Sequence, residues 1–260
     1  MNKFVSAVAS LALMASCASE PVSDFERINN SPEWSLKMED SCRGNWQDQW
    51  FLDGLIATVT NTAEGMDFRA GEEYGNDAHH AVLWTKDSFE GDVKIEYNYT
   101  RTEEQTVNVN ILYIQAQGTG EDGLDKDISK WKRDVPTMSI YYKYMDPLHI
   151  SYAAFPMVNE DPTDDYLRVR KYPISEEISF DQMEVEPTFF HLELFKPFIT
   201  YKVTVIKDDT HLYMNVEGDG REECYTWSLE GKVINTYGRI GLRHMYTRAA
   251  MYSDFKVYTK

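Results

Sequence analysis

Two arginines separated by one residue are the first candidates for chemistry on an acidic ligand. Arg168 and Arg170 lie in the alternating run Tyr166 to Lys171, so their side chains fall on one face of a strand. A guanidinium can hold a carboxylate or sulfate through two parallel hydrogen bonds. The chain has 43 acidic and 26 basic side chains and a net charge of −17. In so acidic a chain, paired arginines on one face indicate an anionic ligand. The alternative is ion pairing with neighbouring acids on a solvated sheet face: Asp164, Asp165 and Glu186.

His149 and Tyr152 lie in the run that comes before these arginines. Elimination from a uronic acid needs a base for the proton beside the carboxylate, a cation at that carboxylate, and an acid for the departing oxygen. We expect His149 and Tyr152 as base and acid, with Arg168 at the carboxylate. In a regular strand His149 and Ser151 share one face and Tyr152 takes the other. A structural, hydrogen-bonded histidine is the alternative for His149.

Other polar and aromatic residues are expected to hold the sugar. Asn108 and Asn110 share a face of an otherwise apolar run, and a buried asparagine needs partners such as sugar hydroxyls. Trp131, in an Asp-rich loop, is expected to stack on a sugar ring, with a plug over the groove as the alternative. The expected substrate-binding set is Asn110, Gln115, Arg170, Arg243, His80 and Trp131.

Metal and hydrolytic chemistry are disfavoured. His79 and His80 are adjacent and would point to opposite faces of a strand, although in a loop both could face one ligand. No metal spacing of Cys and His occurs. No Glu-x-Asp-x-x-Glu run is present for a retaining glycosidase. The nearest run is Glu184-Val-Glu186-Pro, where the proline disfavours a central strand. We expect no cofactor and no metal at the site, and keep a hydrolase with an unrecognised acid pair as an alternative.

Short alternating runs rich in Val, Ile, Tyr and Phe must position these residues. Turn signals such as Glu217-Gly-Asp-Gly220 separate the runs. One short helix is expected around 127–133. The pattern predicts an all-β sandwich or jelly roll, as one domain over 31–260. The expected strands are 92–99, 107–115, 138–144, 166–171, 201–207, 211–216 and 255–258.

The first sixteen residues predict export. Lys3, the apolar run 4–14 and small residues before Cys17 form a lipoprotein signal peptide over 1–16, with an ordinary signal peptide as the alternative. Lipidated Cys17 would begin a flexible spacer over 17–30. The lipid anchor would place the protein at the outer membrane, the cell surface or in the periplasm. The oligomeric state stays open.

Charge and cysteine content narrow the partners. The acidic balance disfavours nucleic acid, whose phosphates it would repel. Cys42 and Cys224 lie near opposite ends of the domain and would remain after processing at Cys17. An exported protein permits a disulfide between them, and two separate thiols are the alternative.

Longer motifs resemble the concanavalin-like jelly rolls: Trp46-Gln-Asp-Gln-Trp50, Leu83-Trp-Thr-Lys and the closing run Tyr237-Gly-Arg-Ile-Gly. More narrowly, the chain resembles the YesU-like family, a domain of unknown function from bacterial polysaccharide-utilisation gene sets. The residues that carry this likeness are Asn110-Ile-Leu, Gln115-Ala-Gln-Gly118, His149-Ile-Ser-Tyr152, Tyr166-Leu-Arg-Val-Arg170 and Gly241-Leu-Arg-His-Met245.

The resemblance implies a curved two-sheet fold with a glycan groove on its concave face. A structural Ca²⁺ is common in such jelly rolls, and Asp254 lies near a position that frequently binds it. The chain is also similar to an oligosaccharide dehydratase of marine ulvan degradation. We therefore expect a carbon–oxygen lyase, of the dehydratase or polysaccharide-lyase type, acting on oligosaccharides of uronic acids such as ulvan or pectin fragments. The main alternative is a non-catalytic glycan-binding surface lipoprotein.

Overall fold

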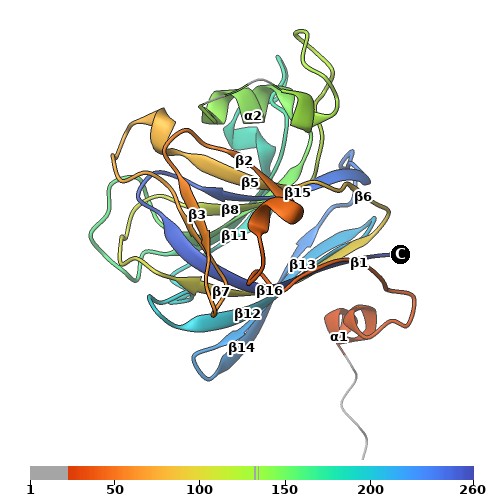
Figure 1. Ribbon diagram of the computed structural model, residues 1–260. Coiled ribbons are helices and arrows are strands. Elements are labelled where there is room, and N and C mark those ends of the chain that lie inside the picture. The colour runs from red at the N-terminus through yellow and green to blue at the C-terminus, as the bar shows by residue number, and fades with distance from the viewer. Residues whose placement is uncertain (1–22, 132, 134) are drawn as a thin grey trace, which may run out of the picture.

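The alternating runs fold as antiparallel strands that form two eight-stranded sheets, packed face to face (Figure 1). The computed structural model describes residues 23–131, 133 and 135–260. The expected signal peptide and Cys17 lie outside these residues. The all-β, two-sheet architecture predicted from the periodicity is confirmed.

The first sheet, here called sheet A, carries both ends of the described chain. Its order is β14 (Arg221–Ser228), β13 (His211–Gly218), β12 (Thr200–Lys207), β7 (Val93–Arg101), β16 (Ala249–Thr259), β4 (Met66–Arg69) and β3 (Thr58–Asn61), and β1 (Ser35–Asp40) pairs with β16.

The second sheet, sheet B, carries most of the expected site residues. Its order is β11 (Glu184–Phe190), β10 (Tyr166–Lys171), β9 (Leu148–Ala154), β8 (Asn110–Ala116), β15 (Tyr237–His244), β5 (Ala81–Thr85) and β2 (Trp50–Asp53), and β6 (Phe89–Glu90) pairs with β15. Pro187 lies in β11, an edge strand, where a missing N–H breaks no ladder.

The main core lies between the sheets, where alternate side chains from both inner faces meet. Tyrosines dominate its centre: Tyr97, Tyr99, Tyr152 and Tyr252 are all buried there. Edge-on and tilted ring contacts join them, with the Tyr99 and Tyr152 centroids 5.1 Å apart. Burial of each such side chain contributes about 1.5–3 kcal/mol. This aromatic core fixes which face of each strand points outward.

A second apolar cluster covers part of the outer face of sheet B. Helix α2 (Met138–Tyr144) and the chain before it pack on this face, above β8, β15, β5 and β2 (Figure 1).

The sequence predicted a strand over 138–144, and that prediction is wrong. Three tyrosines and an isoleucine fit either period over seven residues, and Tyr141 buries its ring on the cluster as part of a helix. Instead of a helix over 127–133, a 3₁₀ turn spans Ile128–Lys130.

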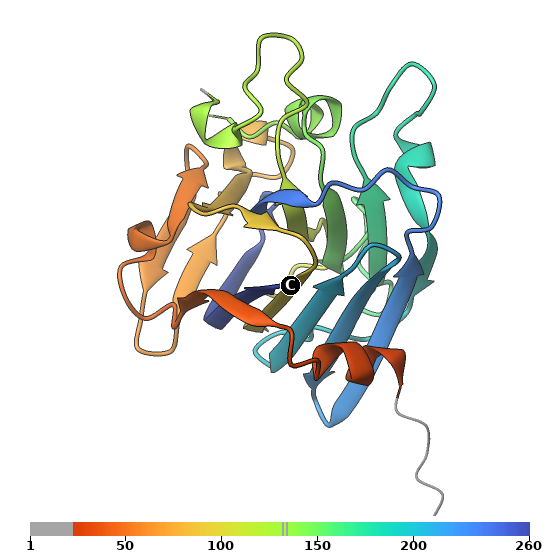
Figure 2. The ribbon, with the colours of Figure 1, turned by 90° about the vertical axis from the view of Figure 1, so that its right-hand side faces the viewer.

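Helix α1 (Asp24–Asn29) packs on sheet A, away from α2 (Figures 1 and 2). A capping box at Ser23 and Glu26 begins the helix. Phe25 and Ile28 are buried against Ile206 and Tyr213. The expected flexible spacer up to residue 30 is therefore wrong for residues 24–29, because their apolar side chains dock on the sheet. Among the helices that the structure describes, none is long and apolar enough to span a membrane.

The two remaining cysteines stay separate. Cys42 is buried in the main core, whereas Cys224 is exposed on edge strand β14, and both thiols are free. Burial raises the pKa of Cys42 to about 12 and, more weakly, that of Cys224 to about 11. The separate-thiol alternative is the one that the fold adopts.

Candidate functional site

The strand register arranges polar side chains in rows across the outer face of sheet B. In one row, Gly241 pairs with Tyr113, Tyr113 with His149, and His149 with Arg170. In the next row, Arg243 pairs with Ile111, Ile111 with Ser151, and Ser151 with Arg168. Because residues two apart share a face, both rows point outward. The prediction that His149 and Ser151 share one face of their strand, and that Arg168 and Arg170 share one face of theirs, is confirmed.

A pocket of about 380 Å³ lies over the β8–β10 part of this face. Met138 and Tyr142 of α2 line it on one side, and Phe155, Met157 and Phe180 from the loops that follow β9 and β10 line it as well. A hydrogen bond of 2.6 Å from the Tyr74 hydroxyl to the Met157 carbonyl crosses one end. The Tyr142 and Phe180 rings meet edge-on at 5.2 Å at the other. Polar lining residues are Asp77, His80, Asn108, Tyr142, His149, Ser151, Tyr166, Arg168, Arg170 and Tyr246.

His149 lies on the floor of this pocket. Its side chain is 1% exposed, and neither ring nitrogen has a hydrogen-bond partner among the described residues. The ring is held edge-on against Tyr172 at 4.8 Å. Burial, followed by the charges of Arg170 and Arg243, holds its pKa well below the usual value. The imidazole is therefore neutral near pH 7, with one lone pair free to accept a proton or a hydrogen bond.

Arg168 and Arg170 border His149, and their ion-pair partner is Glu184. Arg168 Nε lies 3.0 Å from the Glu184 carboxylate, and Arg170 Nη2 lies 3.9 Å from it. The two guanidinium groups stand over the rings of Tyr166 and Phe180, at 4.7 and 4.6 Å. Burial and the charge of Arg168 lower the pKa of Arg170. One carboxylate against two guanidinium groups leaves net positive charge beside the pocket.

His80 lines the opposite side of the pocket, and Arg243 lies behind it. Arg243 is fully buried, and its Nη2 contacts His80 Nδ1 at 2.6 Å and the Pro136 carbonyl at 2.7 Å. Burial, then the Arg243 charge, lowers the pKa of His80 to about 3. His79 turns away, where its Nδ1 accepts from the Glu73 N–H and its Nε2 lies 3.2 Å from the Glu73 carboxylate.

Two expected site residues, Tyr152 and Asn110, face the inter-sheet core. The Tyr152 hydroxyl is 3.1 Å from that of Tyr252, and burial raises its pKa well above the usual value. Asn110 donates to the Tyr99 hydroxyl and accepts from Arg248 Nε. A positive φ of 65° at Asn108 breaks the alternation, so Asn108 lines the pocket and Asn110 does not. Roles for Tyr152 in catalysis and for Asn110 in sugar binding are therefore corrected.

Gln115 and Trp131 also serve the fold. The Gln115 amide donates to the carbonyls of Phe89, Gly91 and Thr236, and its oxygen accepts from Lys207 at 2.9 Å. Gln115 is fully buried and its amide N–H groups are all donated within the protein, so the expected role in sugar binding is corrected.

Trp131 is 8% exposed, and its Nε1 donates to the Asp125 carbonyl at 2.5 Å. Its ring is buried in the second apolar cluster and does not line the pocket, so the expected stacking on a sugar ring is corrected.

The sequence interpretation missed the tyrosines beside His149. Tyr113 and Tyr172 are buried on the outer face of sheet B, and neither hydroxyl has a partner among the residues that the structure describes. The place of Tyr113 in the 107–115 run could have marked it as a candidate. The chain has seventeen tyrosines, however, so the residue type alone does not single it out. Tyr172 directly follows β10 and becomes a neighbour of His149 only through the pairing of β9 with β10.

The residues near Asp254 do not fit the expected structural Ca²⁺. The Asp254 carboxylate accepts from Arg43 Nη1 at 2.8 Å and from the Asn98 amide at 3.1 Å. Within residues 23–131, 133 and 135–260, no three His, Cys, Asp or Glu side chains are grouped to hold a metal. A cation would compete with Arg43 for the same oxygens.

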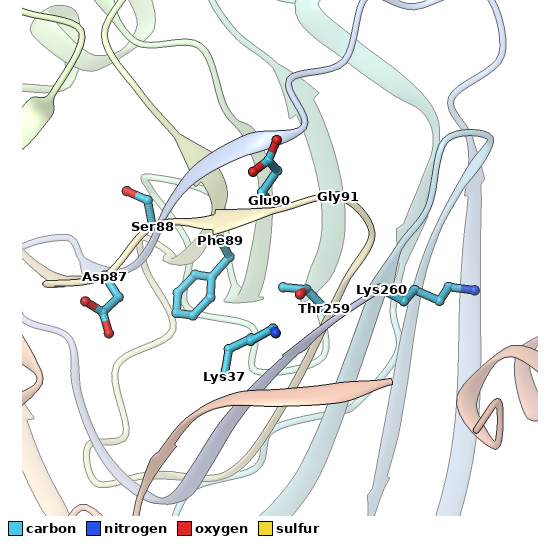
Figure 3. Close-up of a pocket in the computed structure, with 8 residues that line it drawn as sticks. All are labelled: Lys37, Asp87, Ser88, Phe89, Glu90, Gly91, Thr259 and Lys260. Atoms are coloured by element: carbon cyan, nitrogen blue, oxygen red, sulfur yellow. The ribbon is translucent and has the colours of Figure 1, made fainter. Parts of the chain in front are cut away.

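A second hollow lies between β6 and the end of β16 (Figure 3). Glu90 points away from Phe89, and Lys260 points out of the hollow (Figure 3). Its lining contains neither a histidine nor an arginine, unlike that of the pocket over β8–β10: Lys37, Asp87, Ser88, Phe89, Glu90, Gly91, Thr259 and Lys260.

Comparisons with known proteins agree with the fold. A family model described as a domain of unknown function, DUF1961, matches residues 44–257. Among curated proteins, none matches the chain.

Three solved structures show the same fold. A protein of unknown function with a galectin-like fold from Bacillus subtilis is 20% identical over 87% of this chain and 98% of its own, with a TM-score of 0.63. The exoplasmic domain of VIP36 in its Ca²⁺/Man3GlcNAc-bound form is 11% identical over 87% and 90%, with a TM-score of 0.56. Lectin UEA-II complexed with galactose is 6% identical over 87% and 100%, with a TM-score of 0.54. The expected concanavalin-like jelly roll is thereby confirmed.

Proposed function

The chain belongs to the DUF1961 family, and we propose that its pocket binds oligosaccharides of uronic acids, such as ulvan or pectin fragments, and breaks a carbon–oxygen bond in them by elimination. The neighbours of the fold support a sugar ligand, since VIP36 and lectin UEA-II carry Man3GlcNAc and galactose in their structures. The chemistry is proposed from this chain's own pocket.

One observation carries the proposal: a neutral, buried imidazole, with no hydrogen-bond partner in the described part of the chain, lies beside two arginines. An unmade hydrogen bond on a buried polar group costs about 1–3 kcal/mol. His149 leaves both nitrogens in this state among the described residues, within the same pocket as Arg168 and Arg170. A bound sugar that satisfies the imidazole, and a carboxylate that meets the guanidinium groups, would account for that cost.

The proposed reaction balances without a cofactor. His149 removes the proton on the carbon beside the carboxylate, and Arg168 and Arg170 stabilise the enolate that develops there. The electron pair then forms a carbon–carbon double bond as the carbon–oxygen bond at the next carbon breaks. The protonated His149 returns its proton to the departing oxygen, which leaves as water or as a sugar hydroxyl, so the imidazole ends neutral again. A hydrolase is disfavoured, because Asp77 is the only carboxylic acid among the described lining residues.

Mass spectrometry of uronate oligosaccharides after incubation tests the proposal. We expect loss of one water, or chain cleavage with a new double bond, for the wild type. His149→Gln should lose the activity and keep its fold and its affinity by calorimetry. Tyr152→Phe is the matched control and should stay active, since Tyr152 faces the core. An active His149→Gln, or a wild type that changes no uronate substrate, would sink the elimination mechanism.

Binding without catalysis is the second candidate. The depressed pKa of His149 makes it a weak base, which suits a residue that only accepts a hydrogen bond from a sugar hydroxyl. In that case calorimetry would record binding of uronate oligosaccharides with no change in their mass.

We also propose that the protein is lipid-anchored through Cys17 at a membrane surface. Helix α1 docks on sheet A (Figure 2), whereas the pocket lies on the outer face of sheet B. A tether leading to α1 would leave the pocket open to soluble oligosaccharide. Cys17→Ala should move the protein from the membrane fraction to the soluble fraction, and unchanged fractionation would contradict the anchor.

A further inference from the structure

The contact between Arg243 and His80 determines which nitrogen of His80 carries a hydrogen. The Arg243 Nη2 group has two hydrogens and no lone pair to accept with. One hydrogen goes to the Pro136 carbonyl, at 2.7 Å, and the other points at His80 Nδ1, at 2.6 Å. A hydrogen on Nδ1 would collide with that donor. Nδ1 must therefore be the acceptor, and the hydrogen of the neutral ring lies on Nε2.

His80 Nε2 has no partner among the residues from 23 to 260 that the structure describes, although it is buried. His80 lines the pocket that also contains His149, Arg168 and Arg170. The other groups around the ring are the Tyr246 ring, at 4.6 Å, Asp77 in the same lining, and His79 next in the chain. The ring is held in place by its tilted contact with the Tyr246 ring on one side and by Arg243 at its edge.

We propose that Arg243 is a positioning residue that holds His80 as a neutral Nε2–H donor, and that this N–H binds an oxygen of the acidic sugar opposite Arg168 and Arg170. This inference rests on the proposed function for the identity of the ligand. The two pocket histidines then differ in role. His149 offers a lone pair, whereas His80 offers only a hydrogen, because its lone pair is taken by the guanidinium.

Nitrogen NMR of histidine-labelled protein tests the tautomer without any substrate. We expect a single Nε2–H signal for His80, neutral from pH 8 down to about pH 5, below the ordinary histidine value of about 6.5. Arg243→Gln should shift the ring toward a mixture of tautomers. Arg239→Gln is the matched control on the same strand, since Arg239 pairs with Asp127 and not with His80. An Nδ1–H ring, or an imidazolium at pH 6, in the wild type would overturn the proposal even if Arg243→Gln failed to fold.

Binding of a uronate oligosaccharide tests the donor role separately. A glutamine can place an amide N–H near the position of Nε2, so His80→Gln should keep affinity within about threefold, whereas His80→Leu should weaken it about tenfold. Equal affinity of the wild type and His80→Leu would remove the donor role. The two proposals can fail separately. If the tautomer and the affinities of the His80 variants are as expected but no uronate substrate undergoes elimination, the proposed reaction is wrong and the role of His80 still holds.

Discussion

Arg170 and Arg168 illustrate how single residues bias the pocket toward anions. In a protein with net charge −17, a carboxylated ligand is repelled at long range and must gain its affinity at short range. Glu184 neutralises part of the arginine pair, and it holds Arg168 Nε more closely than Arg170. Arg170 is therefore the guanidinium with the weaker ion pair inside the protein.

Replacing Arg170 should lower affinity for acidic sugars selectively. We expect Arg170→Gln to weaken binding of a uronate oligosaccharide about tenfold, because hydrogen bonds to charged groups contribute about 1.5–3 kcal/mol. Binding of a neutral oligosaccharide of the same length should not change. Calorimetry with both ligands measures the difference, and Arg69→Gln, at an exposed ion pair on β4, is the control. Equal losses for both ligands would contradict the anionic site.

At the scale of an element, β15 connects the pocket to the layer that covers the rest of sheet B. Gly241 pairs with Trp84 on one side and Tyr113 on the other. The indole of Trp84 lies over the position that a Gly241 side chain would take. Its Nε1 donates to Asp53, which also accepts from Arg133. The missing side chain therefore allows the covering layer to settle on the sheet beside His149.

A methyl group at Gly241 should disturb this layer. A Cβ there would overlap the Trp84 ring, so Gly241→Ala is expected to cost about 1–3 kcal/mol of unfolding free energy, as overpacked cores do. Denaturant unfolding measures this cost. Gly44→Ala is the control, since a Cβ at Gly44 meets no atom within 4 Å. A Gly241→Ala protein as stable as Gly44→Ala would show that Trp84 moves aside freely.

For the whole molecule, three buried histidines connect stability to pH. Burial, the largest cause in each case, lowers the pKa of His80 and His244 to about 3 and that of His149 well below 6.5. Below about pH 6.5 the unfolded chain binds protons that the folded protein does not. Their contribution to stability is complete above that pH and is lost as the pH falls toward 3.

Unfolding free energy should therefore fall on acidification from about pH 6.5, by up to about 1.4 kcal/mol per pH unit for each buried histidine. Urea unfolding between pH 7 and about pH 5 measures the slope, above the range in which most carboxylates titrate. His244→Gln should reduce the slope, whereas His191→Gln, at an exposed side chain, should not. Equal slopes for the two variants would contradict the assignment.

The sequence by itself determined the architecture and the outward rows of the site. Period-two runs and turn signals require many antiparallel strands, and a period of two places His149 with Ser151 and Arg168 with Arg170 wherever the strands are regular. These predictions depend only on local backbone geometry. The prediction of a strand over 138–144 was wrong, because seven residues fit either period.

Only the tertiary structure decided which face of each strand points outward and what fills it. Tyr152 was misassigned because it was chosen for its closeness to His149 in the chain, although the alternation of β9 turns it to the opposite face. Asn110 was misassigned because the positive φ of Asn108, just before β8, breaks the alternation that was expected to put the two asparagines on one face. Gln115 and Trp131 were misassigned because their partners lie far along the chain or in the fold of a loop. Register between strands, which no single run encodes, brings Arg243, Tyr113, His149 and Arg170 into adjacent rows and so creates the pocket.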